Sequence, residues 1–262
     1  MTVDERALVH RWIRASGVLA ACTLCLGHAA NVVARDLPTA EQVFARHTQA
    51  IGGSEAIAQI KNMTAEFTYS VPSLGVSARG TAFVEYPGRS YSSVDFESEN
   101  GSDFASGTSG DIAWQMDPER GVRLLQGDER RIALHAARVD SFERWSELWD
   151  KAETVAQVTI GASLCYQVLL SSFDGQPLSA FFARDSGLLI REDLPVPAIG
   201  GVVTTTFRDF REVGGVVTAH RIEQEGWMPF TIVYTSVRYN VADLPTDVFQ
   251  VPEELQQPSV TP

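Results

Sequence analysis

The chain has 262 residues, of which 44% are hydrophobic, and its formal net charge at pH 7 is -12. A chain of this length and apolar content can bury a substantial core, so we expect one main folded domain. Such an acidic surface repels phosphate backbones and anionic lipid head groups at long range, so we do not expect a nucleic-acid partner.

The first 34 residues have the layout of a secretory signal. Arg6, Arg11 and Arg14 precede an uncharged run over residues 15–26, and small residues follow it. The run is too short to span a bilayer, which takes about 20 apolar residues, and no later stretch is long and apolar enough. We therefore expect an exported protein of the periplasm or cell envelope, with no transmembrane span in the mature chain.

Two ways of processing this segment stay open. The residues before Ala30 and before Arg35 fit an ordinary signal peptidase, which would release a free protein. Residues 19–22 (LAAC) instead resemble a bacterial lipobox, which would make Cys22 a lipidated N-terminus. We favour the free protein, because only seven uncharged residues precede Cys22 in the second case. Removal of residues 1–34 leaves Cys165 as the one cysteine, so no internal disulfide is expected.

Two helices are expected before any strand, over residues 39–61. Thr39 and Gln42 have the form of a capping box, and apolar residues at helical spacing follow them. Gly52 and Gly53 then end the first helix. Ser54 is placed to cap a second, shorter helix.

From residue 62 to residue 240 the chain reads as short stretches of alternating polarity separated by Gly, Pro, Asp and Asn. This period of two is typical of strands with one buried face, so we predict strands over residues 62–126 and 153–240. The fold class is therefore mainly β (α+β), with a curved antiparallel sheet of about ten or eleven strands covered by helices. One domain would span residues 35–251, followed by a disordered tail over residues 252–262.

A helical insert interrupts the strands at residues 127–152. Phe142, Trp145 and Trp149 form an aromatic stripe, which we assign to a second helix of the insert that begins near residue 140. Two roles stay open for this stripe. It presents apolar surface to a ligand at the mouth of the curved sheet, or it only fixes the insert to the sheet.

Several phrases of the sequence occur together in an order and spacing that resemble one family. They are Ile51-Gly52-Gly53 with Glu55-Ala56-Ile57, Trp114 with Asp117-Pro118, residues 121–127 (GVRLLQG), residues 165–168 (CYQV), residues 187–191 (GLLIR) and residues 207–216 (FRDFREVGGV). On these phrases the chain resembles exported bacterial proteins of the LolA/LolB-like superfamily, often described as outer-membrane lipoprotein-sorting proteins. The resemblance covers nearly the whole chain after residue 34.

The resemblance implies a curved, incompletely closed antiparallel barrel covered by helices, with an apolar cavity that accepts acyl chains of lipids or lipoproteins. One position departs from the family pattern. Lipoprotein chaperones of this type are similar in carrying an arginine on an early strand that ties down the helical lid, whereas residues 63–71 contain none. Arg79 is the nearest arginine, and we do not transfer the role to it. The departure favours a different cargo over a lipoprotein shuttle.

Apolar side chains from neighbouring strands and from the insert are expected to line such a cavity. They are Phe67, Tyr69, Val94, Phe96, Trp114 and Met116 on the strands, and Phe142, Trp145 and Trp149 on the insert. Small barrels are often packed solid, so the same residues also fit a filled core.

No catalytic or metal-binding motif occurs in the sequence. Residues 107–110 (GTSG) lack the form of a nucleophile elbow, and there is no H-E-x-x-H or paired Cys/His spacing. His47, His135 and His220 are far apart in the sequence, and the acidic residues around Trp114 lack the spacing of a calcium loop. We therefore predict a protein that is not an enzyme and that uses no cofactor or metal.

Two hypotheses about function follow. The first is an exported, non-enzymatic protein that holds a lipid, a lipoprotein acyl chain or another hydrophobic ligand in an apolar cavity. The alternative is a periplasmic sensor or regulatory module with the same fold and a filled core, which binds an envelope protein. An exposed apolar edge or groove beside a filled interior would favour the alternative.

Overall fold

The computed structural model describes residues 37–96, 104–118, 120–173, 175–197, 200–226 and 229–256. The expected signal segment, both expected cleavage positions and Cys22 lie outside these residues. Within the described ranges, no helix is long and apolar enough to cross a membrane.

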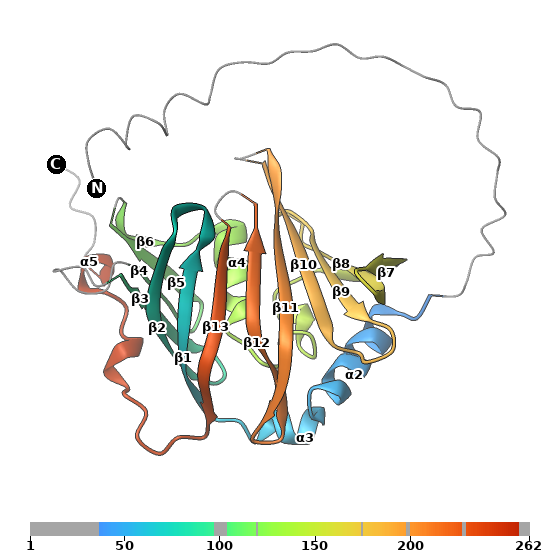
Figure 1. The fold of residues 1–262 in the computed structure, drawn as a ribbon, viewed down its shortest axis with the longest axis horizontal. Coiled ribbons are helices and arrows are strands. Elements are labelled where there is room, and N and C mark those ends of the chain that lie inside the picture. The colour runs from blue at the N-terminus through green and yellow to red at the C-terminus, as the bar shows by residue number, and fades with distance from the viewer. Residues whose placement is uncertain are drawn as a thin grey trace, which may run out of the picture. The chain divides into compact units, whose positions relative to one another are not determined.

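One antiparallel sheet dominates the described residues (Figure 1). Its thirteen strands run in the order β6-β5-β4-β3-β2-β1-β13-β12-β11-β10-β9-β8-β7, so β6 and β7 are its edges and the sheet does not close. The strands are β1 (Asn62–Val71), β2 (Val76–Glu85), β3 (Arg89–Asp95), β4 (Phe104–Ser109), β5 (Ile112–Asp117), β6 (Gly121–Leu124), β7 (Lys151–Ile160), β8 (Ser163–Ser171), β9 (Leu178–Ala183), β10 (Leu189–Val196), β11 (Gly201–Val213), β12 (Val216–Glu225) and β13 (Phe230–Tyr239). The predicted fold class is confirmed, with more strands than expected.

Strand β4, which consists mostly of small residues, explains part of this difference. Its Gly107 pairs with Trp114 of β5, and a Cβ atom at Gly107 would lie 2.8 Å from the indole ring. The glycine leaves the space that this ring fills, so the segment pairs as a strand despite its low strand propensity.

Two helices precede the sheet, as predicted. α2 (Ala40–Ala50) begins at the expected capping box, in which the Gln42 amide donates to Thr39 Oγ1 at 3.3 Å and the Thr39 amide donates to Gln42 Oε1 at 2.9 Å. The next helix, α3 (Gly53–Ala58), has Gly52 as its N-cap, so the prediction that Ser54 caps it is wrong. The Ser54 hydroxyl instead donates to Glu143 Oε1 at 2.9 Å.

The insert contains one helix and a series of turns. α4 (Gly127–Ala136) is followed by turns over residues 139–144 and by the 3₁₀ turn η2 (Trp145–Glu147). The prediction of a second helix from residue 140 is therefore wrong. Arg138 forms ion pairs with Asp140 and Glu147, and these pairs hold the turns together where the backbone does not continue as a helix.

Helices α2 and α4 pack on one face of the sheet, which we call the inner face. The ring of Phe44 on α2 lies 5.7 Å from the ring of Phe182 on β9, and His135 Nε2 on α4 lies 3.2 Å from Glu192 Oε1 on β10. In Figure 1, α4 lies behind the central strands. Directly paired residues of antiparallel strands point to the same face, so the pairing register assigns each strand residue to the inner or the outer face.

The C-terminal segment crosses part of the outer face. After β13 the chain forms η4 (Asp247–Phe249) and α5 (Glu253–Gln256), which contact β3, β4 and β6 (Figure 1). Phe249 is buried there, and the guanidinium of Arg89 lies 5.3 Å from the centre of its ring. α5 thus falls within the range expected to be disordered, and residues 257–262 lie outside the described part.

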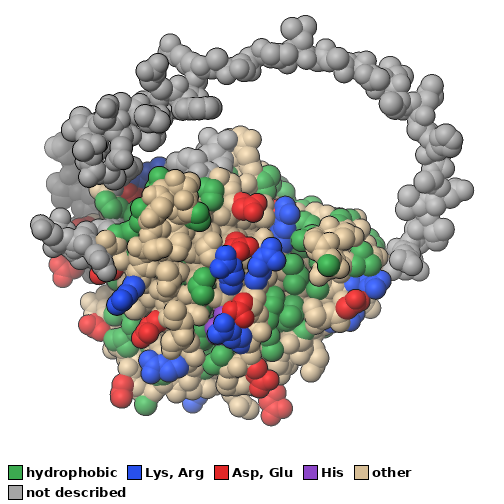
Figure 2. All heavy atoms as spheres, viewed as in Figure 1, with side chains coloured by type: hydrophobic (Ala, Val, Ile, Leu, Met, Phe, Trp, Pro, Cys, Tyr) green, Lys and Arg blue, Asp and Glu red, His purple; other side chains and the backbone are tan. Residues whose placement is uncertain are grey.

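The outer face of the central strands carries pairs of opposite charge. Glu223 on β12 accepts hydrogen bonds from Arg208 of β11 at 2.8 Å and from Arg221 at 2.7 Å. Figure 2 shows basic and acidic side chains close to one another over these strands. A solvated outer face and a covered inner face are typical of an antiparallel sheet with one buried side.

Candidate functional site

The inner face over β8, β9 and β10 is filled by aromatic side chains, and we call it the filled half. The Phe142 ring of the insert lies 5.3 Å from the Phe44 ring and 4.9 Å from the Phe182 ring. All three rings are buried and pack on Val168 and Leu170 of β8. This half of the inner face is therefore protein core.

Two histidines contact Phe142 in the filled half. The rings of His47 on α2 and His135 on α4 approach the Phe142 ring edge-on, at 5.5 Å and 4.9 Å. Burial lowers the pKa of His47 from 6.5 to about 4, although its contact with the Gly187 carbonyl and the charge of Glu192 act in the opposite direction. His47 is therefore neutral in this core at neutral pH.

The inner face over β1, β2, β3 and β13 is covered less completely, and we call it the hollow half. Its buried members are Ala65, Phe67 and Ala82. Around them lie apolar side chains that are only half-buried: Met63, Tyr69, Val94, Ile232, Tyr234 and Val237. A continuous apolar surface of the sheet thus stays partly open to solvent or to a ligand.

Small inward residues on β2 make room in the hollow half. Ala78, Gly80 and Ala82 pair with Tyr69, Phe67 and Ala65 of β1, so all of them point inward. A Cβ atom at Gly80 would lie 2.1 Å from Cε2 of Phe67, because the Phe67 ring lies across the glycine. The middle of β2 therefore contributes little side-chain volume of its own to this half, whereas Val84 near its end also points inward.

Three tyrosines add hydroxyl groups beside the hollow half. Burial raises the pKa of Tyr234 to about 12, and burial also raises the pKa of Tyr86, with smaller contributions from Tyr239 and Asp140. The Tyr239 hydroxyl lies 2.8 Å from Thr218 Oγ1. These phenols stay protonated at neutral pH, so they offer neutral hydroxyl groups next to an apolar surface.

A groove runs between the insert and the turns at one end of the sheet, and we call it the insert groove. It consists of three adjoining pockets of about 730, 560 and 560 Å³, in which neighbours share lining residues. Leu134 and Leu148 line both the first and the second pocket, and Tyr86 and Pro87 line both the second and the third. Each volume lies within the range of about 300–1,000 Å³ that is usual for small-molecule sites.

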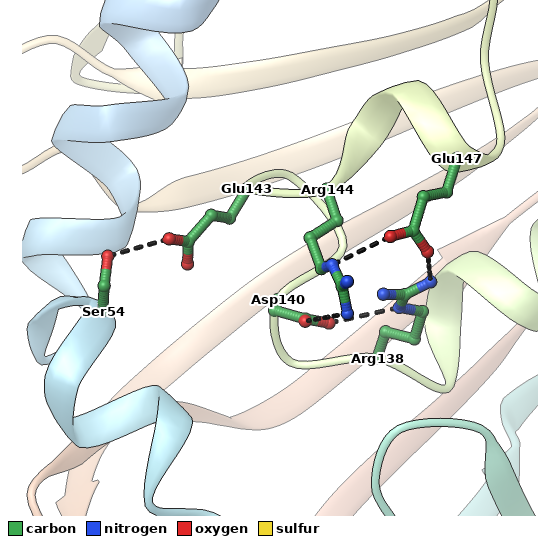
Figure 3. A network of polar contacts seen from close by, with 6 residues as sticks. All are labelled: Ser54, Arg138, Asp140, Glu143, Arg144 and Glu147. Carbon is green, nitrogen blue, oxygen red and sulfur yellow. Dashed lines mark hydrogen bonds and ion pairs between the residues drawn. The ribbon is translucent and has the colours of Figure 1, made fainter.

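A polar network forms one wall of the insert groove (Figure 3). Arg138 donates to Asp140 at 3.1 Å and to Glu147 at 2.6 Å, and Arg144 pairs with Glu147 at 2.8 Å. The separate Ser54–Glu143 hydrogen bond, next to these ion pairs in Figure 3, ties the insert to α3. The groove therefore combines apolar lining with charges that are already paired, unlike the wholly apolar cavity that the family resemblance implies.

The strand residues expected to bind a ligand fall on both faces of the sheet. Val94 of β3 pairs with Phe104 of β4, and both side chains point inward. Phe67 and Tyr69 of β1 point inward as well. Phe96 lies 6.0 Å from Tyr69, ring to ring, and so joins the inner group. Trp114 and Met116 pair with Gly107 and Ala105, the β4 positions that alternate with Phe104, so they point outward.

The stripe residues of the insert lie in or beside the filled half. Phe142 and Trp149 are buried, and the guanidinium of Arg131 lies 5.5 Å from the Trp149 ring centre. Trp145 is half-buried, with its ring 6.4 Å from the Phe44 ring, beside a pocket of about 230 Å³. These contacts connect the insert to α2 and β9, as the second of the two roles requires, and a ligand contact of the stripe stays a prediction.

Several residues of the site were not identified from the sequence. They are the core partners Phe44 and Phe182, the tyrosines Tyr86, Tyr234 and Tyr239, and the network residues Arg138, Asp140, Arg144 and Glu147. The alternation of small residues on β2 was a usable signal for the hollow half. Among the described residues, no group of three or more His, Cys, Asp or Glu side chains is placed to hold a metal ion.

No protein-family model matches the sequence, and no curated protein matches it either. Solved structures do. A LolA superfamily protein from Nitrosomonas europaea is 15% identical, with a TM-score of 0.56, over 82% of this chain and 99% of its own. A putative outer membrane lipoprotein-sorting protein domain from Vibrio parahaemolyticus is 10% identical, with a TM-score of 0.57, over 80% and 97%.

A DUF1329 family protein from Desulfovibrio piger is also similar, with 12% identity and a TM-score of 0.56 over 80% of this chain and 98% of its own. Identities this low support a common architecture and not a common activity. The chain has the LolA-like fold.

Proposed function

We propose that this protein is an exported, non-enzymatic binding protein that holds a lipid, an acyl chain or another hydrophobic ligand against the hollow half. The observation that carries the proposal is the contrast between the two halves of the inner face. Phe142 and Phe182 fill one half, whereas Val94, Ile232 and Val237 remain half-buried in the other. An apolar surface that the protein leaves partly uncovered is typical of a binding site.

The dimensions and chemistry of the site support an elongated apolar ligand. The hollow half spans four neighbouring strands, and Tyr86 and Pro87 of the insert groove follow β2 directly. Burial of an acyl chain stabilises by about 0.8 kcal/mol per methylene, so a chain of about twelve carbons supplies on the order of 10 kcal/mol before the costs of binding. The neutral tyrosine hydroxyls can donate hydrogen bonds to a polar end of the ligand.

The similar protein from Vibrio parahaemolyticus, described as a putative lipoprotein-sorting domain, is consistent with a carrier. The acyl chain of a lipid or a lipoprotein is therefore the ligand class to test first. Export rests on the signal-like residues 1–34, and anchoring through Cys22 is the alternative to a free protein. Mass analysis of the mature N-terminus distinguishes the two, because a lipidated chain begins at Cys22 and a free one at Ala30 or Arg35.

The ligand site can be tested by filling it. Ile232 points into the hollow half, and Val233, the next residue on β13, points outward. We expect Ile232→Trp to weaken binding of a fluorescent long-chain fatty acid at least tenfold, because the larger ring occupies the space of the acyl chain. Val233→Trp is the matched control and should bind the probe as the wild type does.

Native mass spectrometry of the gently purified protein gives an independent measurement. A hydrophobic molecule should copurify with the wild type and with Val233→Trp, and less of it with Ile232→Trp. A wild-type protein that is empty and also ignores the fatty-acid probe would contradict the proposal, as would equal binding by the two tryptophan variants.

The alternative, a regulatory module that binds an envelope protein, has its own support in the filled half. The stripe residues Phe142 and Trp149 are core residues, as a module without a ligand would have them. Such a module would show no copurifying lipid and would be insensitive to Ile232→Trp. The same experiment therefore separates the two functions.

A further inference from the structure

Exposed apolar side chains gather at one end of the sheet, and we call them the apolar rim. The β1–β2 turn carries Leu74, which is 71% exposed, and the neighbouring Val76 is exposed as well. Val202 at the start of β11 is 47% exposed, and Phe104 at the start of β4 is also exposed. These four residues are half of the large hydrophobic side chains that are exposed within the described ranges.

The pairing register places the four residues at the same end of the sheet. Consecutive antiparallel strands alternate in direction, so the β1–β2 turn and the start of β4 lie at one end. Ser70 near the end of β1 pairs with Thr231 at the start of β13, whose neighbour Phe230 pairs with Gln224 near the end of β12. β11 starts beside that end of β12, and Figure 1 shows the β1–β2 turn and the start of β11 at the upper end of the sheet.

Aromatic side chains continue from the rim into the hollow half. The Phe104 ring lies 5.8 Å from the Phe96 ring, which lies 6.0 Å from the Tyr69 ring. The Phe230 ring lies 5.0 Å from the Tyr69 ring on its other side. The apolar surface of the hollow half therefore reaches the rim without a break.

The charges around the rim determine which partner fits it. Residues 72–76 and 200–203 contain no charged side chain, whereas the exposed carboxylates of Asp95 at the end of β3 and Glu225 at the end of β12 lie at the same end of the sheet. The chain as a whole carries a net charge of -12, which disfavours an anionic surface at long range. Single apolar side chains at the tips of separate hairpins suit insertion into the interface of a bilayer, whereas a stable protein interface needs a continuous surface.

We propose that the apolar rim docks on a lipid bilayer with uncharged or zwitterionic head groups, with Leu74 and Val202 inserted between the lipids. This inference extends the proposed function, because docking at this end would open the hollow half toward the membrane and let a lipid pass without crossing water. The aromatic series from Phe104 to Tyr69 would then form the path. Phenylalanine and leucine are typical of the apolar surfaces that proteins bury at a membrane interface.

A site-specific label tests the docking. In a Cys22→Ser, Cys25→Ser chain, an environment-sensitive fluorophore on Leu74→Cys should gain intensity and shift to the blue with phosphatidylcholine vesicles, and lipid-borne quenchers should quench it. Ile112 is the matched control, because it is 44% exposed and follows the β4–β5 turn at the opposite end of the sheet. The same label on Ile112→Cys should not respond.

Binding to the same vesicles gives the magnitude. We expect Leu74→Ser and Val202→Ser each to weaken vesicle binding on the order of tenfold, and Ile112→Ser to leave it unchanged. The N-terminal segment is the same in all variants, so it cannot produce a difference between them. Equal responses at positions 74 and 112, or unchanged vesicle binding by Leu74→Ser and Val202→Ser, would overturn the proposal.

The fatty-acid probe in solution separates this inference from the proposed function. The serine variants should bind the probe as the wild type does, because the rim lies outside the hollow half. A chain that docks through Leu74 and binds no probe would refute the proposed ligand site and leave the docking surface. A chain that binds the probe and shows no rim-dependent docking would refute the inference alone.

Discussion

Acidification is expected to destabilise this fold through His47 before the carboxylates begin to lose their ion pairs. The imidazole is buried between α2 and β9, with its ring 5.5 Å from Phe142 and 5.2 Å from Phe182. Its pKa is about 4 in the folded protein and 6.5 when exposed. Between these two values the unfolded chain binds a proton that the folded chain does not, so stability falls as the pH falls.

The size of the effect follows from the two pKa values. Each pH unit of difference corresponds to about 1.4 kcal/mol, so the loss approaches about 3 kcal/mol near pH 4. The loss begins near pH 6.5 and is complete below pH 4. A domain of this kind has a total stability of about 5–15 kcal/mol, so the loss is a large fraction of it.

Urea unfolding of the full chain at a series of pH values from about 7.5 to 4.5 measures this loss directly. His47→Gln has no group that titrates in this range, so the variant should lose the part of the pH dependence that His47 contributes, although it is less stable at pH 7. The pKa of His47 can also be read from the NMR titration of its ring protons, with a midpoint expected near 4.

The ion-paired carboxylate Glu223 contributes to the pH dependence mainly below the range in which His47 acts. Hydrogen bonds from Arg208 and Arg221 lower the pKa of Glu223 below its ordinary value of 4.5, so its contribution to stability is lost only at lower pH. A His47→Gln chain with the full pH dependence of the wild type between pH 6.5 and 4.5 would refute the reasoning, as would a His47 midpoint near 6.5.

Two further substitutions test the packing of the two halves. Gly80→Ala should destabilise the protein by about 1–3 kcal/mol in urea unfolding, because the new Cβ would collide with the Phe67 ring. Gly88→Ala is the control. The nearest atom there is 3.9 Å from the added Cβ, so this substitution should cost less than about 0.5 kcal/mol. Equal costs would show that the ring has room to move. Phe142→Ala should lower the free energy of unfolding by about 3–5 kcal/mol in the same assay, because it removes a buried ring that contacts two other phenylalanine rings. Trp145→Ala should lower it clearly less, since Trp145 is only half-buried. The reverse order would contradict the assignment of Phe142 to the centre of the filled half.

The fold class could be predicted because alternation and capping are local properties of the sequence. Thr39 and Gln42 defined the start of α2, and the alternation on β1 and β2 defined the inner face there. The same local patterns wrongly predicted a second helix in the insert, where the structure has turns. Its aromatic residues have helical spacing, but the ion pairs of Arg138 with Asp140 and Glu147 stabilise turns instead, and helical spacing does not reveal such pairs.

The face on which the strand residues of the proposed ligand site lie was predicted less well, because it depends on the register between strands. Trp114 and Met116 alternate correctly with polar neighbours, yet the pairing of β4 with β5 turns them to the outer face. A difference of one residue in register moves a whole strand to the other face, and the turn residues between β3 and β5 gave no means to fix it. Phe67 and Tyr69 needed no such information, since their strand shares its inner face with the small residues of β2.

The difference between the filled and the hollow half has a cause in the size of the inward residues. On β8 the inward positions include Val168 and Leu170, which meet aromatic rings from α2 and the insert. The inward positions in the middle of β2 are Ala78, Gly80 and Ala82, and the larger Val76 and Val84 stand only at its ends. In a close-packed core, side-chain volume missing from one layer is supplied by the layer that faces it. The helix of the insert, α4, has its main contacts with β4 and β5. The Phe67 ring takes up the space over Gly80, and the neighbouring apolar side chains of β13 stay only half-buried. Alternation thus identifies the inner face, and the size of the residues along it distinguishes a packed core from a surface that a ligand can cover.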